Sequence, residues 1–133
     1  MIFIDTNVLL DVVTDDAVWA EWSQRQLEAA ALRDRLAINP VVYAEFSSRF
    51  ARVEDIDAML ATAAIAVVEM SRATLFLAGQ TFREYRRRGG PRIGVLPDFF
   101  IGAQAVLAGA PLITRDVRQY RSYFPTIELV APG

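Results

Sequence analysis

The stretch Met1-Ile2-Phe3-Ile4-Asp5-Thr6-Asn7-Val8-Leu9-Leu10-Asp11, at the start of the chain, decides the fold class. Its first four residues are apolar without alternation, which is typical of a strand buried on both faces of a parallel sheet. Asp5 closes this strand, and Thr6 or Asn7 could cap a short helix over 8–13. A buried strand that leads directly into a helix predicts an α/β architecture.

The remaining sequence repeats this alternation. Further strands are expected at 36–39, 65–70, 112–114 and 127–130. Helices are expected at 15–32, 41–50, 53–64, 72–88 and 97–108. The chain is therefore predicted to form one domain, residues 1–133, with helices on both faces of a central parallel sheet of four to five strands: a three-layer α/β/α sandwich.

Residues that start and stop helices support these bounds. Pro40 suits the first turn of one helix, Ser71 can cap another, and Gly89-Gly90-Pro91 is a strong stop. The apolar face of helix 72–88 is expected to consist of Leu75, Ala78, Phe82 and Tyr85.

The composition excludes several kinds of chemistry. Cysteine and histidine are absent, so disulfides, thiolate catalysis, thiolate-bound zinc and the commonest general base are excluded. All fourteen basic residues are arginine, so no lysine can form a Schiff base or assist phosphate chemistry. Catalysis would have to use carboxylates, hydroxyls, arginines or metal-bound water.

The net charge of −2 does not by itself suggest a nucleic-acid binder. Without the four carboxylates that are proposed below as a site, however, the remaining chain has twelve acidic residues and fourteen arginines, so its net charge is positive. The most apolar stretch, 99–113, is shorter than the roughly 18 residues that span a bilayer, and no signal peptide is recognised. A cytoplasmic protein without a membrane partner is expected.

Four acidic residues lie where a parallel fold would gather them: Asp5, Glu45, Asp98 and Asp116. Ligand sites in open parallel sheets form beyond the carboxyl ends of the strands. Carboxylates brought together there repel one another unless a cation neutralises them, and an all-oxygen site suits Mg²⁺ or Mn²⁺. Such ions polarise phosphodiesters and activate water.

Each of these residues also has an ordinary structural interpretation. Asp5 and Asp116 could be turn or cap residues, and Asp98 could cap its helix. Glu45 is expected early in its helix, where apolar neighbours suggest a partly covered position. Asp98, in contrast, begins a helix that is apolar nearly all round, so its carboxylate should lie near the interior and need a partner or a cation. Thr114 could hydrogen-bond a neighbouring carboxylate or a bound water.

The order of these residues resembles that of PIN-domain ribonucleases, and most of all VapC-type toxins of bacterial toxin–antitoxin pairs. The resemblance extends from Met1 to about Phe124 and rests on residues 4–11, Glu45, residues 97–103 and residues 112–116. It implies a Mg²⁺- or Mn²⁺-dependent endoribonuclease that acts on an RNA substrate. It also implies a homodimer and a cognate antitoxin.

The resemblance places the acidic tetrad on Asp5, Glu45, Asp98 and Asp116, with Asn7 and Thr114 at accessory polar positions. Asp5 and Asp98 are expected to bind the main metal, with Asp116 as a ligand directly or through water. Glu45 is expected to position or deprotonate the attacking water, or to hold a second ion.

An arginine cluster is the other candidate functional feature, and it comprises Arg83, Arg86, Arg87, Arg88 and Arg92. It could be a solvated helix end, where cations favour the helix dipole. It could also bind RNA phosphates or an acidic antitoxin segment. The sequence does not separate these interpretations.

Two other protein classes with a parallel sheet fit this sequence less well. A phosphoryl-receiver domain normally relies on a lysine, which this chain lacks, and a haloacid-dehalogenase-type phosphatase would need Asp rather than Asn7. A catalytically silent binding module for RNA or a protein partner remains open. Trp19, Trp22, Phe99 and Phe100 offer more apolar surface than one small sheet easily covers, which favours a homodimer.

Overall fold

The computed structural model describes residues 1–91 and 96–133. The described chain forms five strands: β1 (Ile2–Ile4), β2 (Leu36–Ile38), β3 (Ile65–Val67), β4 (Leu112–Ile113) and β5 (Leu129–Val130). All of them pair in parallel, in the order β3-β2-β1-β4-β5. The predicted parallel sheet is confirmed, with β1 at its centre.

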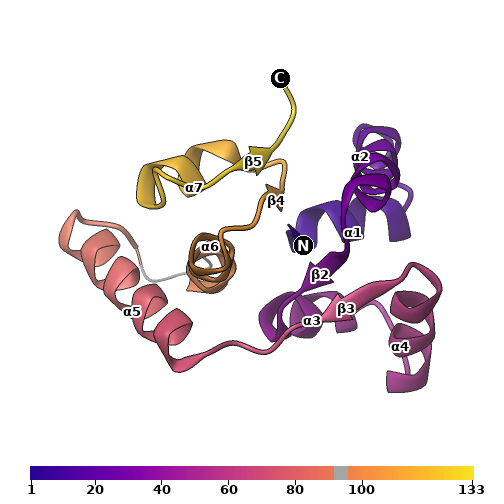
Figure 1. Cartoon of the computed structure of the whole chain (residues 1–133), viewed down its shortest axis with the longest axis horizontal. Coiled ribbons are helices and arrows are strands. Elements are labelled where there is room, and N and C mark those ends of the chain that lie inside the picture. Colours follow the sequence, from indigo (N-terminus) through magenta and orange to yellow (C-terminus); the bar gives the residue numbers. More distant parts are fainter. Residues whose placement is uncertain (92–95) are drawn as a thin grey trace.

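Seven helices are found in the described residues: α1 (Thr6–Val13), α2 (Ala20–Arg33), α3 (Pro40–Ser47), α4 (Val53–Thr62), α5 (Arg72–Arg87), α6 (Leu96–Ala108) and α7 (Val117–Tyr123). Figure 1 shows α1, α2 and α4 on one side of the sheet and α5, α6 and α7 on the other. The predicted α/β/α sandwich is therefore confirmed. Helix α3 contacts both α1 and α6, so it bridges the two helical layers.

The central strand β1 is buried as its sequence predicts, because Ile2, Phe3 and Ile4 are each at most 3% exposed. Helix α6 is the apolar helix of the opposite layer, and Phe99 and residues 101–105 are buried in it. A Cβ on Gly102 would lie 2.4 Å from the ring of Phe124. Glycine is therefore required there for the ring to pack against the helix backbone.

Several predicted bounds were wrong by a few residues. Strand β3 ends at Val67 rather than residue 70, because its partner β2 offers only three residues for pairing. Strand β5 begins at Leu129 rather than 127, because the Ile127 amide instead donates to the Phe124 carbonyl in a turn. Helix α7 was not predicted at all.

The aromatic residues that were expected to favour a dimer pack within the monomer instead. Phe99 is fully buried, and Trp22 and Phe100 pack against the core. Trp19 meets Trp22 edge to face at 5.9 Å. These aromatic residues therefore give no support to the predicted dimer.

Leu75, expected on the buried face of its helix, is 42% exposed, whereas Ala78 is buried and Phe82 and Tyr85 contact the core.

Two helices are capped by side chains, one of them the predicted Ser71, whereas the prediction that Thr6 or Asn7 caps the first helix was wrong, because both residues lie inside α1. The Asn39 side chain accepts the Val42 amide at the start of α3, and Ser71 accepts the Thr74 amide at the start of α5. Helix α1 begins at Thr6, and the Asp5 side chain makes no capping hydrogen bond there. The Asp5 carboxylate is thus left for other contacts.

Candidate active site

The predicted acidic residues approach one another at the carboxyl edge of the sheet. Asp5 directly follows β1, and β4, the neighbouring strand, ends just before Thr114 and Asp116. Asp98 lies in the first turn of α6. Glu45 reaches the same region from α3, because Thr6 Oγ1 donates to its Oε1 at 2.7 Å.

Asp5 is the buried anchor of this group, at 4% exposure. Its Oδ2 accepts hydrogen bonds from Thr114 Oγ1 at 2.8 Å, from the Tyr120 hydroxyl at 3.0 Å and from Asn7 Nδ2 at 3.4 Å. Burial raises the pKa of Asp5 to about 6, although these hydrogen bonds oppose the shift. Within the described residues, the side-chain hydrogen bonds to Asp5 all go to Oδ2 and none goes to Oδ1.

Asp98 shares the same electrostatic environment. Burial, followed by the charges of Asp5, Asp116 and Glu45, raises its pKa to about 7. Nearby like charges raise a carboxyl pKa in this way. The raised pKa of Asp98 accords with the predicted placement of the four carboxylates on one side of the sheet.

Glu45 differs from expectation in two respects. It occupies the second half of α3 rather than its beginning, and its side chain is exposed rather than partly covered. Glu45 lies three residues after the buried Val42 and one before the buried Phe46, so it borders the buried face of the helix. The hydrogen bond from Thr6 nevertheless orients its carboxylate.

Thr114 joins two parts of the site, as its position predicted. Its hydroxyl donates to Asp5 and accepts the Asp116 amide at 3.0 Å. Asp116 is exposed at the N-terminus of α7, and its side chain makes no capping hydrogen bond. The interpretation of Asp116 as a cap residue is thus not supported.

Tyr120 is a site residue that the sequence analysis missed. It is 1% exposed, and burial together with the charges of Asp5 and Asp98 raises its pKa well above 10. It therefore remains a hydrogen-bond donor at neutral pH. The spacing of Val117, Tyr120 and Phe124 after Asp116 could have indicated the apolar face of α7.

The arginine cluster lies at the C-terminal end of α5. Arg83, Arg86, Arg87 and Arg88 are exposed, while Arg92 lies outside the described residues. Arg86 Nη1 donates to the Gly90 carbonyl at 2.7 Å, and Glu84 pairs with Arg87 and Arg88 at 3.8 and 3.1 Å. Part of the cluster's charge is therefore satisfied locally, as at an ordinary helix end.

The donor set fits a hard divalent cation better than any other group. It contains carboxylates, hydroxyls and an amide, without nitrogen or sulfur ligands, and its carboxylates are mutually repulsive. No three acidic side chains within residues 1–91 and 96–133 stand close enough to form a complete cage. Mg²⁺ is commonly held by only one or two carboxylates and retains several waters, so a cage is not required.

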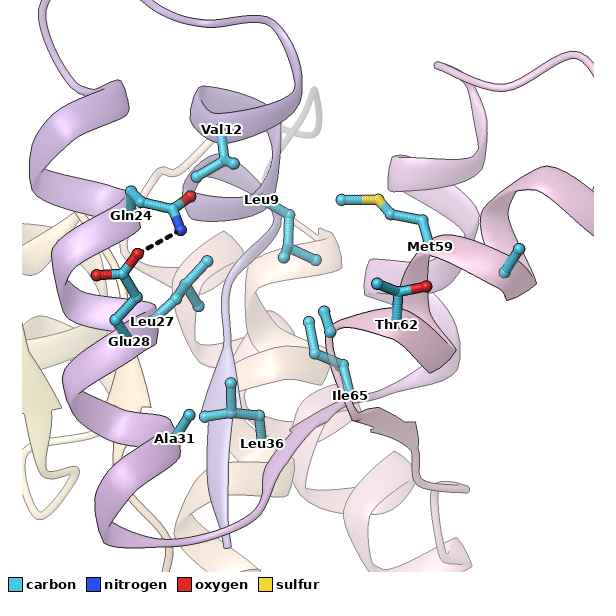
Figure 2. Close-up of a pocket in the computed structure, with 12 residues that line it drawn as sticks. Leu9, Val12, Gln24, Leu27, Glu28, Ala31, Leu36, Met59, Thr62 and Ile65 are labelled. Atoms are coloured by element: carbon cyan, nitrogen blue, oxygen red, sulfur yellow. Dashed lines mark hydrogen bonds between the residues drawn. The ribbon is translucent and has the colours of Figure 1, made fainter.

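A large apolar groove lies away from these carboxylates. A groove of about 540 Å³ is lined by α1, α2, α4 and the starts of β2 and β3, and none of the four carboxylates contributes to it. In Figure 2, Leu27 of α2 and Met59 of α4 face each other across this groove, above Leu36 and Ile65. A hydrogen bond joins Gln24 to Glu28 along its rim. We call it the α2–α4 groove.

A parallel sheet with acidic side chains gathered at its carboxyl edge defines an α/β protein with a candidate cation site. The model of the PIN domain family matches residues 2–125, and the chain belongs to this family. Among curated proteins, no sequence matches the chain significantly.

Solved structures with the same fold share little sequence with this chain. A chain of VapBC2 from Rickettsia felis bound to a DNA fragment from their promoter is 22% identical, with a TM-score of 0.75 and full coverage of both chains. A toxin–antitoxin complex from Klebsiella pneumoniae is 22% identical, with a TM-score of 0.70 over 100% of this chain and 98% of that one. VapBC-1 from nontypeable Haemophilus influenzae is also 22% identical, with a TM-score of 0.70 and 98% coverage of each chain. At this identity, the likeness establishes the fold.

Proposed function

We propose that this chain is a Mg²⁺- or Mn²⁺-dependent endoribonuclease that acts as the toxin of a toxin–antitoxin pair. The observation that carries the proposal is the buried Asp5 at the carboxyl edge of the sheet, where Thr114 and Tyr120 donate to its Oδ2 and Thr6, the next residue, donates to Glu45. Membership of the PIN domain family and the resemblance to VapC-type toxins support RNA as the substrate. Localisation in the cytoplasm, where RNA is available, would follow from this activity.

A bound divalent cation would supply Lewis-acid activation of water and of the scissile phosphodiester. In this proposal Asp5 and Asp98 hold the cation, and Asp116 assists directly or through water. Asn7, Thr114 and Tyr120 keep Asp5 oriented through its Oδ2. Glu45 is exposed and held by Thr6, so it can position the attacking water or accept its proton.

The products distinguish this chemistry from attack by the RNA itself. Water attack leaves a 3′-hydroxyl and a 5′-phosphate, whereas attack by the ribose hydroxyl leaves a 2′,3′-cyclic phosphate. Purified protein should cleave RNA, lose the activity in a chelator and regain it with Mn²⁺. The Glu45→Gln and Asp98→Asn variants are the inactive controls, and cyclic phosphate ends would contradict the mechanism.

A catalytically silent binding module is the alternative function. In that case wild-type protein and Asp98→Asn would bind RNA or a protein partner equally well, and neither would cleave RNA. Sequencing of cleaved RNA ends after brief expression would identify the substrate if the nuclease proposal holds. Transfer, ribosomal and messenger RNA are all candidates.

An antitoxin partner is supported by the structural neighbours, which include toxin–antitoxin complexes. Two surfaces could receive it. The arginine cluster would suit an acidic segment, whereas the α2–α4 groove is apolar and would suit the apolar face of a helix. We favour the groove, because Glu84 and the Gly90 carbonyl already engage Arg86, Arg87 and Arg88.

A homodimer also remains a proposal, although its basis changes. Phe76 of α5 is 69% exposed and Leu107 of α6 is 51% exposed, on two helices that pack on each other. Apolar surface of this kind is a better candidate interface than the buried Phe99. Light scattering at micromolar concentration should give a dimeric mass, and Phe76→Ser should lower it.

A further inference from the structure

The loop between β4 and α7 contains an arginine that bonds none of the four proposed site carboxylates but a fifth one, Asp11. Arg115 lies between Thr114 and Asp116, and its guanidinium forms a two-point ion pair with Asp11 of α1. Nε lies 2.7 Å from Asp11 Oδ2, and Nη2 lies 2.8 Å from Oδ1. The guanidinium carbon lies 5.0 Å from the centre of the Trp19 ring.

Asp11 is only 3% exposed and would be costly to bury without this partner. Ser23 Oγ of α2 donates to Asp11 Oδ2 at 2.7 Å, and Ser23 itself is fully buried. Arg115 is therefore held by Asp11 of α1, which Ser23 of α2 orients, and lies against Trp19, which directly precedes α2. Its planar fork matches both oxygens of Asp11, which an ammonium group could not do.

The backbone of Arg115 is tied to the site by a separate route. Its amide donates to Asn7 Oδ1 at 3.4 Å, and Asn7 Nδ2 donates to Asp5 Oδ2 at 3.4 Å. Thr114 bonds Asp5, and the Asp116 amide bonds Thr114. Each residue of the 114–116 loop is therefore fixed at one point or more.

We propose that Arg115 is a positioning residue whose ion pair with Asp11 holds the 114–116 loop, so that Thr114 orients Asp5 and the Asp116 amide stays bonded to Thr114. The proposal rests on the nuclease function proposed above and deepens it. In this proposal Arg115 is not an RNA contact, because its charge is paired with the buried Asp11 and its guanidinium lies over the Trp19 ring. Removal of the pair should loosen the cation site without affecting the RNA-binding surface.

The test compares Arg115→Met, Arg115→Lys and Asp11→Asn with the wild type. Arg118→Met is the matched control, because Arg118 is an exposed arginine three residues further along the chain. Mn²⁺ affinity is measured by calorimetry without RNA, kcat and KM are measured with RNA, and folding is followed by denaturation. If Arg115→Met does not fold, Arg115→Lys carries the test, because it keeps the charge and loses only the two-point geometry.

Mn²⁺ binding should weaken by about tenfold or more in Arg115→Met and Asp11→Asn, which is typical when a group that orients a metal ligand is lost. Arg115→Lys should be intermediate, and Arg118→Met should match the wild type. The value of kcat should fall with metal affinity, while KM for RNA stays within about twofold. The double variant Asp11→Asn/Arg115→Met should be no worse than Arg115→Met, because the two residues act as one unit.

Two results would overturn the proposal. Reduced stability with unchanged Mn²⁺ affinity and kcat would show a purely structural ion pair. Raised KM for RNA with unchanged Mn²⁺ affinity would show a phosphate contact instead. If the wild type and the variants bind Mn²⁺ equally well, the positioning role of Arg115 is wrong while the proposed nuclease function stands. If the wild type binds no divalent cation, both proposals are wrong.

Discussion

The hydroxyl of Tyr120 donates a hydrogen bond to Asp5 Oδ2 over 3.0 Å, although 115 positions separate the two residues. Both side chains are buried, so the contact orients a carboxylate that water scarcely reaches. The contact also explains why α7 contributes to the site, since that helix supplies the tyrosine that bonds the carboxylate at the end of β1.

The Tyr120→Phe variant should weaken the site while leaving the core filled. Loss of one of several donors to a buried carboxylate should cost about 1 kcal/mol of stability. The pKa of Asp5 should rise further, because the removed hydrogen bond lowers it, and a higher Mn²⁺ concentration should be needed for half-maximal cleavage. Tyr123→Phe is the control, because no hydrogen bond of the Tyr123 hydroxyl is found in the described residues. Identical Mn²⁺ curves for the two variants would contradict this role.

Asp5→Asn should abolish cleavage by orders of magnitude and leave the fold intact. The amide oxygen can still accept hydrogen bonds from Thr114 and Tyr120, while repulsion by Glu45 and Asp98 is relieved. The unfolding midpoint of the metal-free variant should equal or exceed that of the wild type. Asp5→Ala should be less stable than Asp5→Asn, since it leaves two buried hydroxyl donors without their acceptor. A fully active Asp5→Asn protein would end the catalytic interpretation.

The stability of the metal-free protein should decrease as pH rises from 5.5 to 7.5. The folded-state pKa values of Asp5 and Asp98, about 6 and about 7, exceed their usual value of 3.8, so the folded protein binds these protons more tightly than the unfolded chain does. This contribution is complete below the usual value and is lost as pH passes through 6 to 7. Denaturant midpoints at the two pH values measure it.

A matched variant and a metal titration test the same assignment. Asp98→Asn should flatten the decrease in stability, because it removes the group with the higher pKa. Mn²⁺ should stabilise the wild type more at pH 7.5 than at pH 5.5, since protons compete with the metal for carboxylates. The lowered pKa values of Asp16 and Asp34 affect stability only at more acidic pH. A wild-type midpoint that increases from pH 5.5 to 7.5 would refute the assignment.

The arginine cluster can be tested by replacing Arg86, Arg87 and Arg88 with alanine. If they hold RNA phosphates, binding should weaken for all RNA sequences, and the log–log salt dependence should flatten by roughly 0.7 per lost contact. Turnover on saturating RNA should change much less. Arg72→Ala, at the other end of α5, is the control. An unchanged salt slope would identify the cluster as a solvated helix end or, if inhibition by the antitoxin is lost, as the antitoxin site.

The α2–α4 groove can be blocked without disturbing the core. Ala58 is exposed on α4 and lines the groove, so Ala58→Arg should place a long side chain across it. RNA cleavage should persist, and inhibition by the antitoxin should weaken at least tenfold. Ala61→Arg, on the same helix outside the groove lining, should remain fully inhibited. Equal inhibition of both variants would exclude the groove as the antitoxin site.

The sequence by itself determined the architecture and the chemical character of the site. The apolar runs of β1 and α6 required burial, and the alternation of strands with helices predicted a parallel sheet. The carboxyl ends of parallel strands share one edge, which is why Asp5, Glu45 and Asp116 could be predicted at one site, while Asp98 was added because it opens a buried helix. The absence of histidine, cysteine and lysine restricted its chemistry to oxygen ligands and arginine.

Only the tertiary structure decided how that site is held together. The contacts of Asp5 with Tyr120, and of Asp11 with Arg115, join residues more than a hundred positions apart, and local propensity carries no information about such partners. The same holds for burial: Phe99 is covered and Phe76 exposed because of the neighbours that the folded chain provides. Spacing along the chain assigns residues to an edge of the sheet, but distance, orientation and desolvation arise only when separate elements pack against one another.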